Sequence, residues 1–150
     1  MTEQTRGEEP ANVLLVEDNP GDVRLAREAF ETGSDADTLH VVNDGDEALD
    51  FLFRRGDYED APRVDVVLLD LNLPRKNGDE VLAEVRADPE LARIPVVVFT
   101  SSESETDVVR SYDLQANAYL TKPVDPGAFI EAVQAFKRFW LSAVRLPDRD

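Results

Sequence analysis

The amino-acid sequence predicts an α/β fold in which five parallel strands form one doubly wound sheet flanked by five helices. Along the 150 residues, five short apolar runs alternate with amphipathic segments, an order typical of successive βαβ units. Three of the runs are almost continuously aliphatic, as in central parallel strands that are covered on both faces. A chain of this length without an internal repeat is most simply one domain.

Each predicted strand corresponds to one apolar run. In chain order the runs are Asn12 to Val16, Thr38 to Val42, Asp65 to Leu69, Pro95 to Phe99 and Ala118 to Leu120. The first, third and fourth runs are the aliphatic ones, and this pattern predicts that they lie at the centre of the sheet.

The segments between and after these strands have helical patterns. The last segment is the clearest, because five apolar residues fall on one helical stripe at spacings of 4, 3, 4 and 4, namely Phe129, Val133, Phe136, Trp140 and Val144. The stretch SSESETD, after the fourth strand, is rich in residues that cap helices and indicates the start of a fourth helix. After the third strand, Pro74 and Gly78 indicate a turn.

The ends of the chain differ from its middle. Residues 1–11 are polar, charged and without periodicity, so we expect a disordered acidic tail, followed by a domain of residues 12–146 and a C-terminal tail of residues 147–150. No apolar run reaches the roughly 18 residues of a membrane span, and the N-terminus is unlike a signal peptide. We therefore expect a soluble, cytoplasmic protein. The absence of cysteine excludes disulfides and thiolate metal ligands.

The charge balance is strongly acidic. The chain has 32 Asp and Glu against 16 Lys and Arg, a formal net charge of -16. Such a field repels nucleic acid and anionic lipid, so neither is expected as a partner. Acid excess, together with arginine far outnumbering lysine, is typical of a halophilic archaeon, whose cytoplasmic cations screen the self-repulsion. An ordinary acidic protein is the alternative.

The carboxyl ends of parallel strands meet at one edge of a sheet, where ligands bind. The residues that follow or end the strands there are Glu17, Asp18, Asp70, Thr100, Ser101, Thr121, Lys122 and Pro123. Three carboxylates in one place repel one another and need a cation, and oxygen ligands select a hard divalent ion such as Mg²⁺. A calcium loop starting at Asp70 is excluded, because Arg75 occupies the required glycine position and Val81 the required glutamate position.

A carboxylate beside bound Mg²⁺ can act as a nucleophile toward a phosphoryl group and form an acyl phosphate. Asp70 is the candidate nucleophile, Lys122 would hold a phosphoryl oxygen, and Thr100 would donate a hydrogen bond to another. Taken singly, each residue is also explained as surface, cap or strand end. Their joint occurrence at four strand ends favours a site.

Four segments in order, LLVEDNPGD, VVLLDLNLPRKNG, VVVFTSS and AYLTKP, resemble the receiver domain of two-component response regulators, which has a flavodoxin-like fold. The resemblance extends from Asn12 to Val144 and includes the spacings of 30 residues from Asp70 to Thr100 and 52 to Lys122. The segments RGDYEDAPR, DPELARIPVV and FKRFWLSAVRLP further resemble receivers that are paired with phytochrome-type sensor kinases.

The resemblance implies a role for each matching residue. The metal ligands for Mg²⁺, with Mn²⁺ as the alternative ion, would be Glu17, Asp18, Asp70 and Asn72. The catalytic group would be Asp70 as phosphoacceptor with Thr100 and Lys122, and phosphoryl binding would involve Asn72, Thr100, Ser101 and Lys122. Thr100 and Tyr119 would form the conformational switch. Pro123 matches a proline that commonly follows a cis peptide bond. Leu73 and Gln115 depart from common family residues.

Three functions remain open at this point. The favoured one is a signalling module, not an enzyme acting on a separate substrate, which takes a phosphoryl group from a sensor histidine kinase and catalyses its own phosphorylation and dephosphorylation. An aspartate-nucleophile phosphatase of the haloacid dehalogenase type is disfavoured, because its motif needs an aspartate where Asn72 stands. The third is a receiver-like module that binds partners without phosphorylation.

The last predicted helix has more apolar surface than one seam requires. Beside the first stripe, a second is formed by Ala128, Ala132, Ala135 and Phe139. A helix that is apolar on two sides is expected to be buried on two sides. We therefore expect the fourth helix, fifth strand and fifth helix to bind a downstream protein target or to form a homodimer, with interface residues Phe136, Phe139 and Trp140. Coverage by the C-terminal segment of the same chain is the alternative.

Overall fold

A computed structural model describes residues 10–32, 37–101 and 116–141. The strands are β1 (Asn12–Val16), β2 (Thr38–Val42), β3 (Val66–Leu69), β4 (Val96–Thr100) and β5 (Ala118–Thr121). The α-helices are α1 (Pro20–Glu31), α2 (Gly45–Phe53), α3 (Gly78–Ala87) and α5 (Pro126–Phe136), and α5 continues as a π-helical turn, η4 (Lys137–Leu141). Short 3₁₀ turns form at η2 (Gly56–Tyr58) and η3 (Leu91–Arg93).

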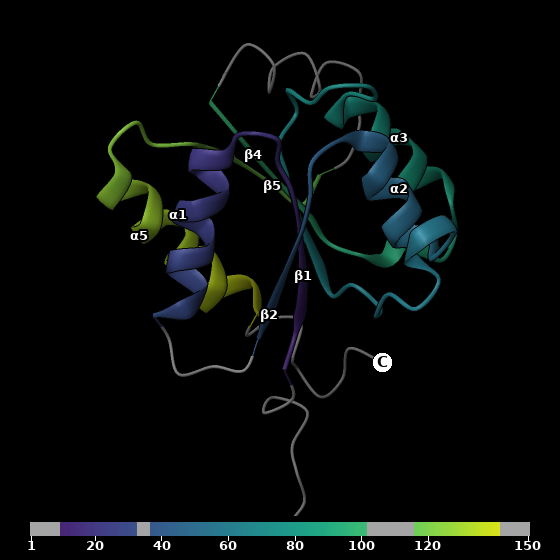
Figure 1. Ribbon diagram of the computed structural model, residues 1–150, viewed down its shortest axis with the longest axis horizontal. Coiled ribbons are helices and arrows are strands. Elements are labelled where there is room, and N and C mark those ends of the chain that lie inside the picture. Colours follow the sequence, from purple (N-terminus) through teal and green to yellow (C-terminus); the bar gives the residue numbers. More distant parts are fainter. Residues whose placement is uncertain (1–9, 33–36, 102–115, 142–150) are drawn as a thin grey trace, which may run out of the picture.

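All neighbouring strands pair in parallel, in the order β2-β1-β3-β4-β5. The aliphatic strands β1, β3 and β4 therefore occupy the three central positions, as predicted. Helices α1 and α5 cover one face of the sheet, and α2 and α3 cover the other (Figure 1). The predicted fold class is confirmed. The fourth helix, predicted from SSESETD onward, lies outside the described residues.

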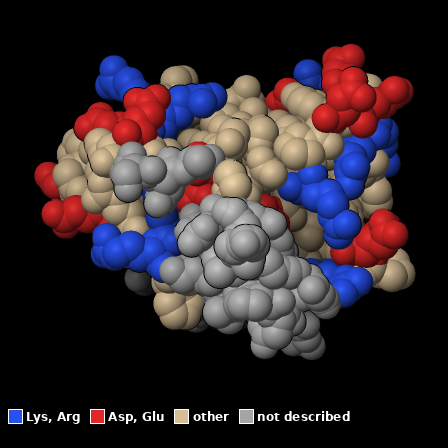
Figure 2. Space-filling model, turned by 90° about the horizontal axis from the view of Figure 1, so that it is seen from below, with Lys and Arg blue, Asp and Glu red and all other residues tan. Residues whose placement is uncertain are grey.

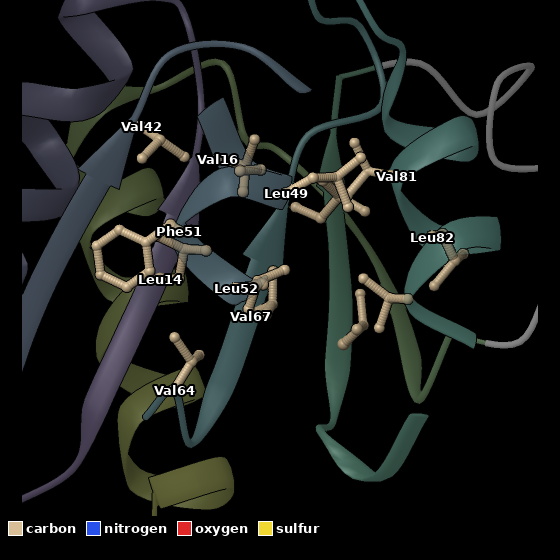
Figure 3. Packing of buried hydrophobic residues seen from close by; sticks show 14 of the residues in the cluster. Leu14, Val16, Val42, Leu49, Phe51, Leu52, Val64, Val67, Val81 and Leu82 are labelled. Carbon is tan, nitrogen blue, oxygen red and sulfur yellow. The ribbon is translucent and has the colours of Figure 1, made fainter. Parts of the chain in front are cut away.

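Alternate residues of each central strand enter two separate hydrophobic cores. In β1, Leu14 and Val16 pack with α2 and α3, whereas Val13 and Leu15 pack with α1 and α5. Figure 3 shows the first core, in which the β1 side chains meet Leu49 of α2. Because both faces are covered, every position of β1 after Asn12 is apolar and buried, and each fully buried aliphatic side chain contributes about 1.5–3 kcal/mol.

Each α-helix in the described part of the chain follows a strand through a loop and begins after a polar residue that caps it. The side chains of Asn19, Asp44 and Asp125 accept hydrogen bonds from backbone N–H groups in the first turns of α1, α2 and α5. At α3, Glu80 accepts from the backbone N–H of Asn77. These caps stop the chain from continuing in extended form, so the helix N-termini lie at the same edge of the sheet as the strand ends.

The boundaries deviate from the predictions by about one residue. Asp65 lies just outside β3, and its carboxylate accepts a hydrogen bond from the backbone N–H of Asn12 at 2.7 Å. Ala11 was assigned to the tail, yet it is 2% exposed and its N–H donates to Asp37 at 2.8 Å. The rest of the expected N-terminal tail, apart from Pro10, and the 147–150 tail lie outside the described residues.

The stripe predicted on the last helix faces the sheet. Phe129, Val133 and Phe136 are each at most 3% exposed and pack in the core beneath α1 and α5. Phe136 is therefore covered within the chain, and its expected place in an interface is wrong, because it belongs to the stripe that packs on the sheet. Phe139, on the second stripe, is 67% exposed. Within the described part of the chain, no helix has the length and apolarity needed to cross a bilayer.

Candidate functional site

Two buried carboxylates are placed side by side by the register of the central strands. Val16, the last residue of β1, pairs with Leu69, the last residue of β3. The chain continues in register, because the Asp70 N–H donates to the Val16 carbonyl at 3.1 Å and the Glu17 N–H donates to the Val42 carbonyl at 3.0 Å. Glu17 and Asp70 are therefore 2% and 5% exposed, at the level where the strands end.

Asp18 completes a group of three acidic side chains. One carboxylate oxygen from each of Glu17, Asp18 and Asp70 lies within 4.8 Å of the other two. Asp18 is exposed, whereas its two neighbours are buried, so the group opens toward solvent on one side. Oxygen donors at this spacing, with access for water, fit a hard divalent cation that keeps part of its hydration shell.

Lys122 places an ammonium group between the carboxylates. Its Nζ lies 2.6 Å from Oε1 of Glu17, 2.9 Å from Oδ2 of Asp70 and 2.9 Å from Oδ2 of Asp22. The backbone delivers it there, because Thr100 pairs with Thr121 and the next N–H, that of Lys122, donates to the Thr100 carbonyl at 2.9 Å. Its three protons thus have three acceptors at a side-chain exposure of 7%.

Burial and pairing act in opposite directions on these groups. Burial lowers the pKa of Lys122, but hydrogen bonds to Glu17, Asp22 and Asp70 outweigh it, so the pKa is raised and the lysine stays charged. Burial, the largest cause, and the charge of Asp70 raise the pKa of Glu17, the hydrogen bond from Lys122 lowers it, and the net result is a pKa of about 7. One ammonium does not neutralise the acids around it, which favours recruitment of another cation.

The loop after Asp70 folds back over the site. The backbone N–H of Asn72 donates to Oδ1 of Asp70 at 3.2 Å, and the buried Leu71 and Leu73 hold Asn72 from both sides. Gly78 closes the loop, because its N–H donates to the Leu71 carbonyl at 3.0 Å and a Cβ there would overlap the carbonyl of Asp70. The exposed side of Asn72 stays at the carboxyl edge of the sheet.

The remaining predicted site residues lie at the ends of β4 and β5. Thr100 is 1% exposed, and Ser101, which follows it, is exposed. Tyr119, in β5, is partly buried, and its hydroxyl oxygen accepts a hydrogen bond of 3.4 Å from the N–H of Ala116. The peptide bond before Pro123 is trans, so the expectation of a cis bond is wrong, in line with the intrinsic trans preference of X–Pro bonds.

Asp22 is a site residue that the sequence analysis missed. It lies in the first turn of α1 and is 100 residues away from Lys122 in the chain. The available signal was its place in DNPGD, where an acid two residues after Pro20 falls in the first turn of the predicted helix. First-turn acids are common for helix stability alone, so the pattern did not indicate a contact with Lys122.

The parallel sheet and the acidic group with its lysine at the carboxyl edge define the class of protein, and comparison with known sequences gives the same class. The chain belongs to the response regulator receiver domain family, whose sequence model matches residues 13–134. Phosphorylation on an aspartate and dependence on Mg²⁺ are typical of this family. The resemblance expected from the four sequence segments is thereby confirmed.

Individual relatives can be named. The chain is 47% identical over 138 residues to the response regulator Rcp1 of Synechocystis sp., covering 92% of this chain and 94% of Rcp1. The crystal structure of Mn²⁺-bound Rcp1 has a TM-score of 0.84 and a coverage of 92% of this chain and 99% of that one. The crystal structure of the phosphorylated cyanobacterial phytochrome response regulator RcpA is 44% identical, with a TM-score of 0.85 and coverages of 90% and 96%.

Proposed function

We propose that this protein accepts a phosphoryl group on Asp70 from the phosphohistidine of a sensor kinase, in a reaction that depends on Mg²⁺. The observation that carries this proposal is the setting of the Asp70 carboxylate. It is buried at a central strand end, one oxygen receives the N–H of Asn72 and the other contacts Lys122, and it belongs to the acidic group with Glu17 and Asp18. These contacts hold the Asp70 carboxylate in place and balance its negative charge, and its oxygen can still attack phosphorus.

In the proposed transfer, phosphorus gains a bond to Asp70 and loses its bond to the donor histidine. A carboxylate oxygen of Asp70 attacks phosphorus, the bond from phosphorus to the donor imidazole nitrogen breaks, and that nitrogen keeps the electron pair and later takes a proton from solvent. Mg²⁺, held by Glu17, Asp18, Asp70 and the backbone carbonyl of Asn72, would neutralise charge on the phosphoryl oxygens. Lys122 would hold a second oxygen, and Thr100, with Ser101 beside it, would donate hydrogen bonds to the group.

The same residues support a self-catalysed cycle. Attack by water on phosphorus would break the acyl phosphate bond, restore Asp70 and release inorganic phosphate, so no separate enzyme is needed for the reset. Thr100 and Tyr119 would change conformation when the phosphoryl group is present and so alter the surface of the protein, as the family resemblance implies. Mg²⁺ is the proposed ion, and the Mn²⁺ bound to Rcp1 supports a site for divalent cations of this kind.

The names of the relatives suggest the class of kinase. RcpA is described as a phytochrome response regulator, and its similarity supports a phytochrome-type sensor kinase as phosphoryl donor for this chain. Such a donor is made by phosphorylation from ATP, which places the proposed reaction in the cytoplasm. A downstream protein target would then read the phosphorylated state.

We also propose that the end of α5 takes part in binding a partner or a second copy of this chain. Phe139 is 67% exposed and its ring makes an edge-on contact with the half-buried Trp140, at 5.3 Å between centroids. Leu120 of β5 is 36% exposed. Exposed aromatic side chains are common anchors of interfaces. The fourth helix, which we expected on this face, lies outside the described residues.

The test of the acceptor uses acetyl phosphate, which supplies the same phosphoryl group without a kinase. With Mg²⁺, the wild-type protein should gain one acid-stable, base-labile phosphoryl group, and Asp70→Asn should gain none. The matched control is Asp46→Asn, which removes an exposed carboxylate from the first turn of α2. Retention of the full label by Asp70→Asn would refute the acceptor assignment.

A further inference from the structure

Lys122 has one partner whose role differs from that of the other two. Its ammonium contacts Glu17 and Asp70, which follow β1 and β3, and also Asp22 in α1 at 2.9 Å. The Asp22 side chain is 24% exposed, so this ion pair lies at the boundary between the buried cluster and solvent. In the described part of the chain, Asp22 is not among the three acids whose oxygens approach one another within 4.8 Å.

A divalent cation and an ammonium group compete for the same carboxylate oxygens. If the cation binds Glu17 and Asp70, it draws their oxygens toward itself and repels the ammonium group of Lys122. Asp22 is the partner of Lys122 that stands apart from the acidic triplet. It therefore keeps its full attraction for the lysine when the cation is present.

We propose that Asp22 is a positioning residue, which holds the Lys122 ammonium at the phosphoryl-binding point while a divalent cation occupies the acidic triplet. The inference rests on the proposed function of Asp70 and adds a requirement for phosphoryl transfer. Without Asp22, the lysine shifts deeper onto Glu17 and Asp70, where it opposes the cation. The ammonium is then less available to the incoming phosphoryl oxygen.

The local structure of α1 makes Asp22 a rigid anchor. The side chain of Asn19 accepts a hydrogen bond from the backbone N–H of Asp22 at 3.0 Å, and Pro20 fixes the first position of the helix. The helix is held in turn by α5, because Gln134 donates to the Thr32 hydroxyl at 2.9 Å. An anchor that is already ordered loses little conformational freedom when it holds the lysine.

A helix-stabilising role for Asp22 must be separated from the proposed one. A carboxylate in the first turn interacts favourably with the helix dipole, whatever its other contacts. Asp46 also lies in the first turn of its helix, α2, but is exposed, so Asp46→Asn removes a first-turn charge from the same edge of the sheet. Asp22→Asn keeps an acceptor oxygen, whereas Asp22→Ala removes it.

The first measurement is the rate of Asp70 phosphorylation by acetyl phosphate at saturating Mg²⁺. Asp22→Ala loses a hydrogen bond between charged groups, so its phosphorylation rate should fall by roughly tenfold or more. The rate should fall less for Asp22→Asn and should equal that of the wild type for Asp46→Asn. Circular dichroism of each variant checks that it is folded. If Asp22→Ala fails to fold, the comparison of Asp22→Asn with Asp46→Asn decides.

The second measurement is Mn²⁺ affinity, obtained from the electron paramagnetic resonance of unbound Mn²⁺. Asp22→Ala should weaken Mn²⁺ binding more than Asp46→Asn does. In a Lys122→Met background, where no ammonium competes, the same two substitutions should have equal effects, because Asp22 then acts only through its charge. A merely structural role would not produce this dependence on Lys122.

The inference is overturned if Asp22→Ala is phosphorylated as fast as Asp46→Asn, or if its effect on Mn²⁺ affinity is the same with and without Lys122. Failure of the proposed function looks different, since Asp70→Asn would then still be labelled whatever the result at Asp22.

Discussion

Buried charges in this protein are held by several partners each. Lys137, at the end of α5, is 7% exposed, and its ammonium group lies 3.4 Å from the Phe30 carbonyl and 4.7 Å from the centre of the Phe30 ring. That carbonyl belongs to the last turn of α1, where the helix dipole favours a cation. At the site, Lys122 has three carboxylates. A buried charge that loses its only partner costs about 3–5 kcal/mol, and several partners protect these lysines from that loss when a single one is removed.

Tyr58 provides a pH-dependent test at the residue scale. Its hydroxyl donates to Oε2 of Glu47 at 2.7 Å, and this hydrogen bond raises the pKa of Tyr58 to about 12 from 10.0. Because the folded state favours the protonated form, the stabilisation is complete below pH 10.0 and is lost as the pH rises through about 12. Tyr58→Phe should lose about 1 kcal/mol of unfolding free energy at neutral pH.

The measurement is urea unfolding of wild type and Tyr58→Phe at several pH values, with absorbance titration of the tyrosines. The difference between the two proteins should be constant up to pH 10.0 and shrink above it. A difference that stays unchanged through pH 12, or a Tyr58 that titrates with its ordinary pKa, would contradict the role of the hydrogen bond with Glu47.

At the scale of elements, the sequence predicted what depends on local pattern. Strands covered on both faces leave long aliphatic runs, so β1 and β2 were placed with the right bounds and the other strands within one residue. Contacts between distant segments were harder to predict. The pair of Asp22 and Lys122 joins residues 100 apart, and nothing local marks it. Phe136 was wrongly placed in the interface, because it belongs to the first apolar stripe, which packs on the sheet.

The end of α5 gives a test at this scale. If the end of α5 mediates self-association, Phe139→Asp should convert a wild-type dimer into a monomer, because it puts a charge on a contact centre. The fold should be retained, since Phe139 is 67% exposed. Sedimentation of both proteins, with and without beryllofluoride, measures the change.

The control for this experiment is Val124→Asp. Val124 is 100% exposed and precedes α5, so the variant makes the same apolar-to-acid change away from the end of the helix. A wild type that remains monomeric in both states, with no partner protected at Phe139, would show that this surface does not mediate binding.

At the scale of the whole molecule, two hydrophobic cores stabilise a chain with a net charge of -16. Acidic and basic side chains both lie on the face shown in Figure 2, and the excess of acids over bases acts as a general repulsion. Ions screen such repulsion over a Debye length of about 10 Å at 0.1 M salt. The acidic composition thus links the stability of the whole fold to ionic strength.

This link predicts that the thermal midpoint rises with KCl from low to multimolar concentration. Mg²⁺ should add a separate increase at low concentration, because it binds the folded site and not the unfolded chain. Melting curves across a KCl series, with and without Mg²⁺ and in wild type and Asp18→Asn, distinguish general screening from site binding. A midpoint that does not respond to KCl would remove the proposal of adaptation to high salt.

The central claim, that Asp70 receives the phosphoryl group, is tested most directly by locating the modification in the wild-type protein. After phosphorylation with acetyl phosphate and Mg²⁺, borohydride reduces an acyl phosphate to an alcohol, and peptide mass spectrometry then identifies the changed residue. We expect the change at Asp70 alone, and no change when Mg²⁺ is removed by a chelator. A reduced residue at Glu17 or Asp18, or a phosphoryl group found instead on His40, the single histidine of the sequence, would contradict the assignment.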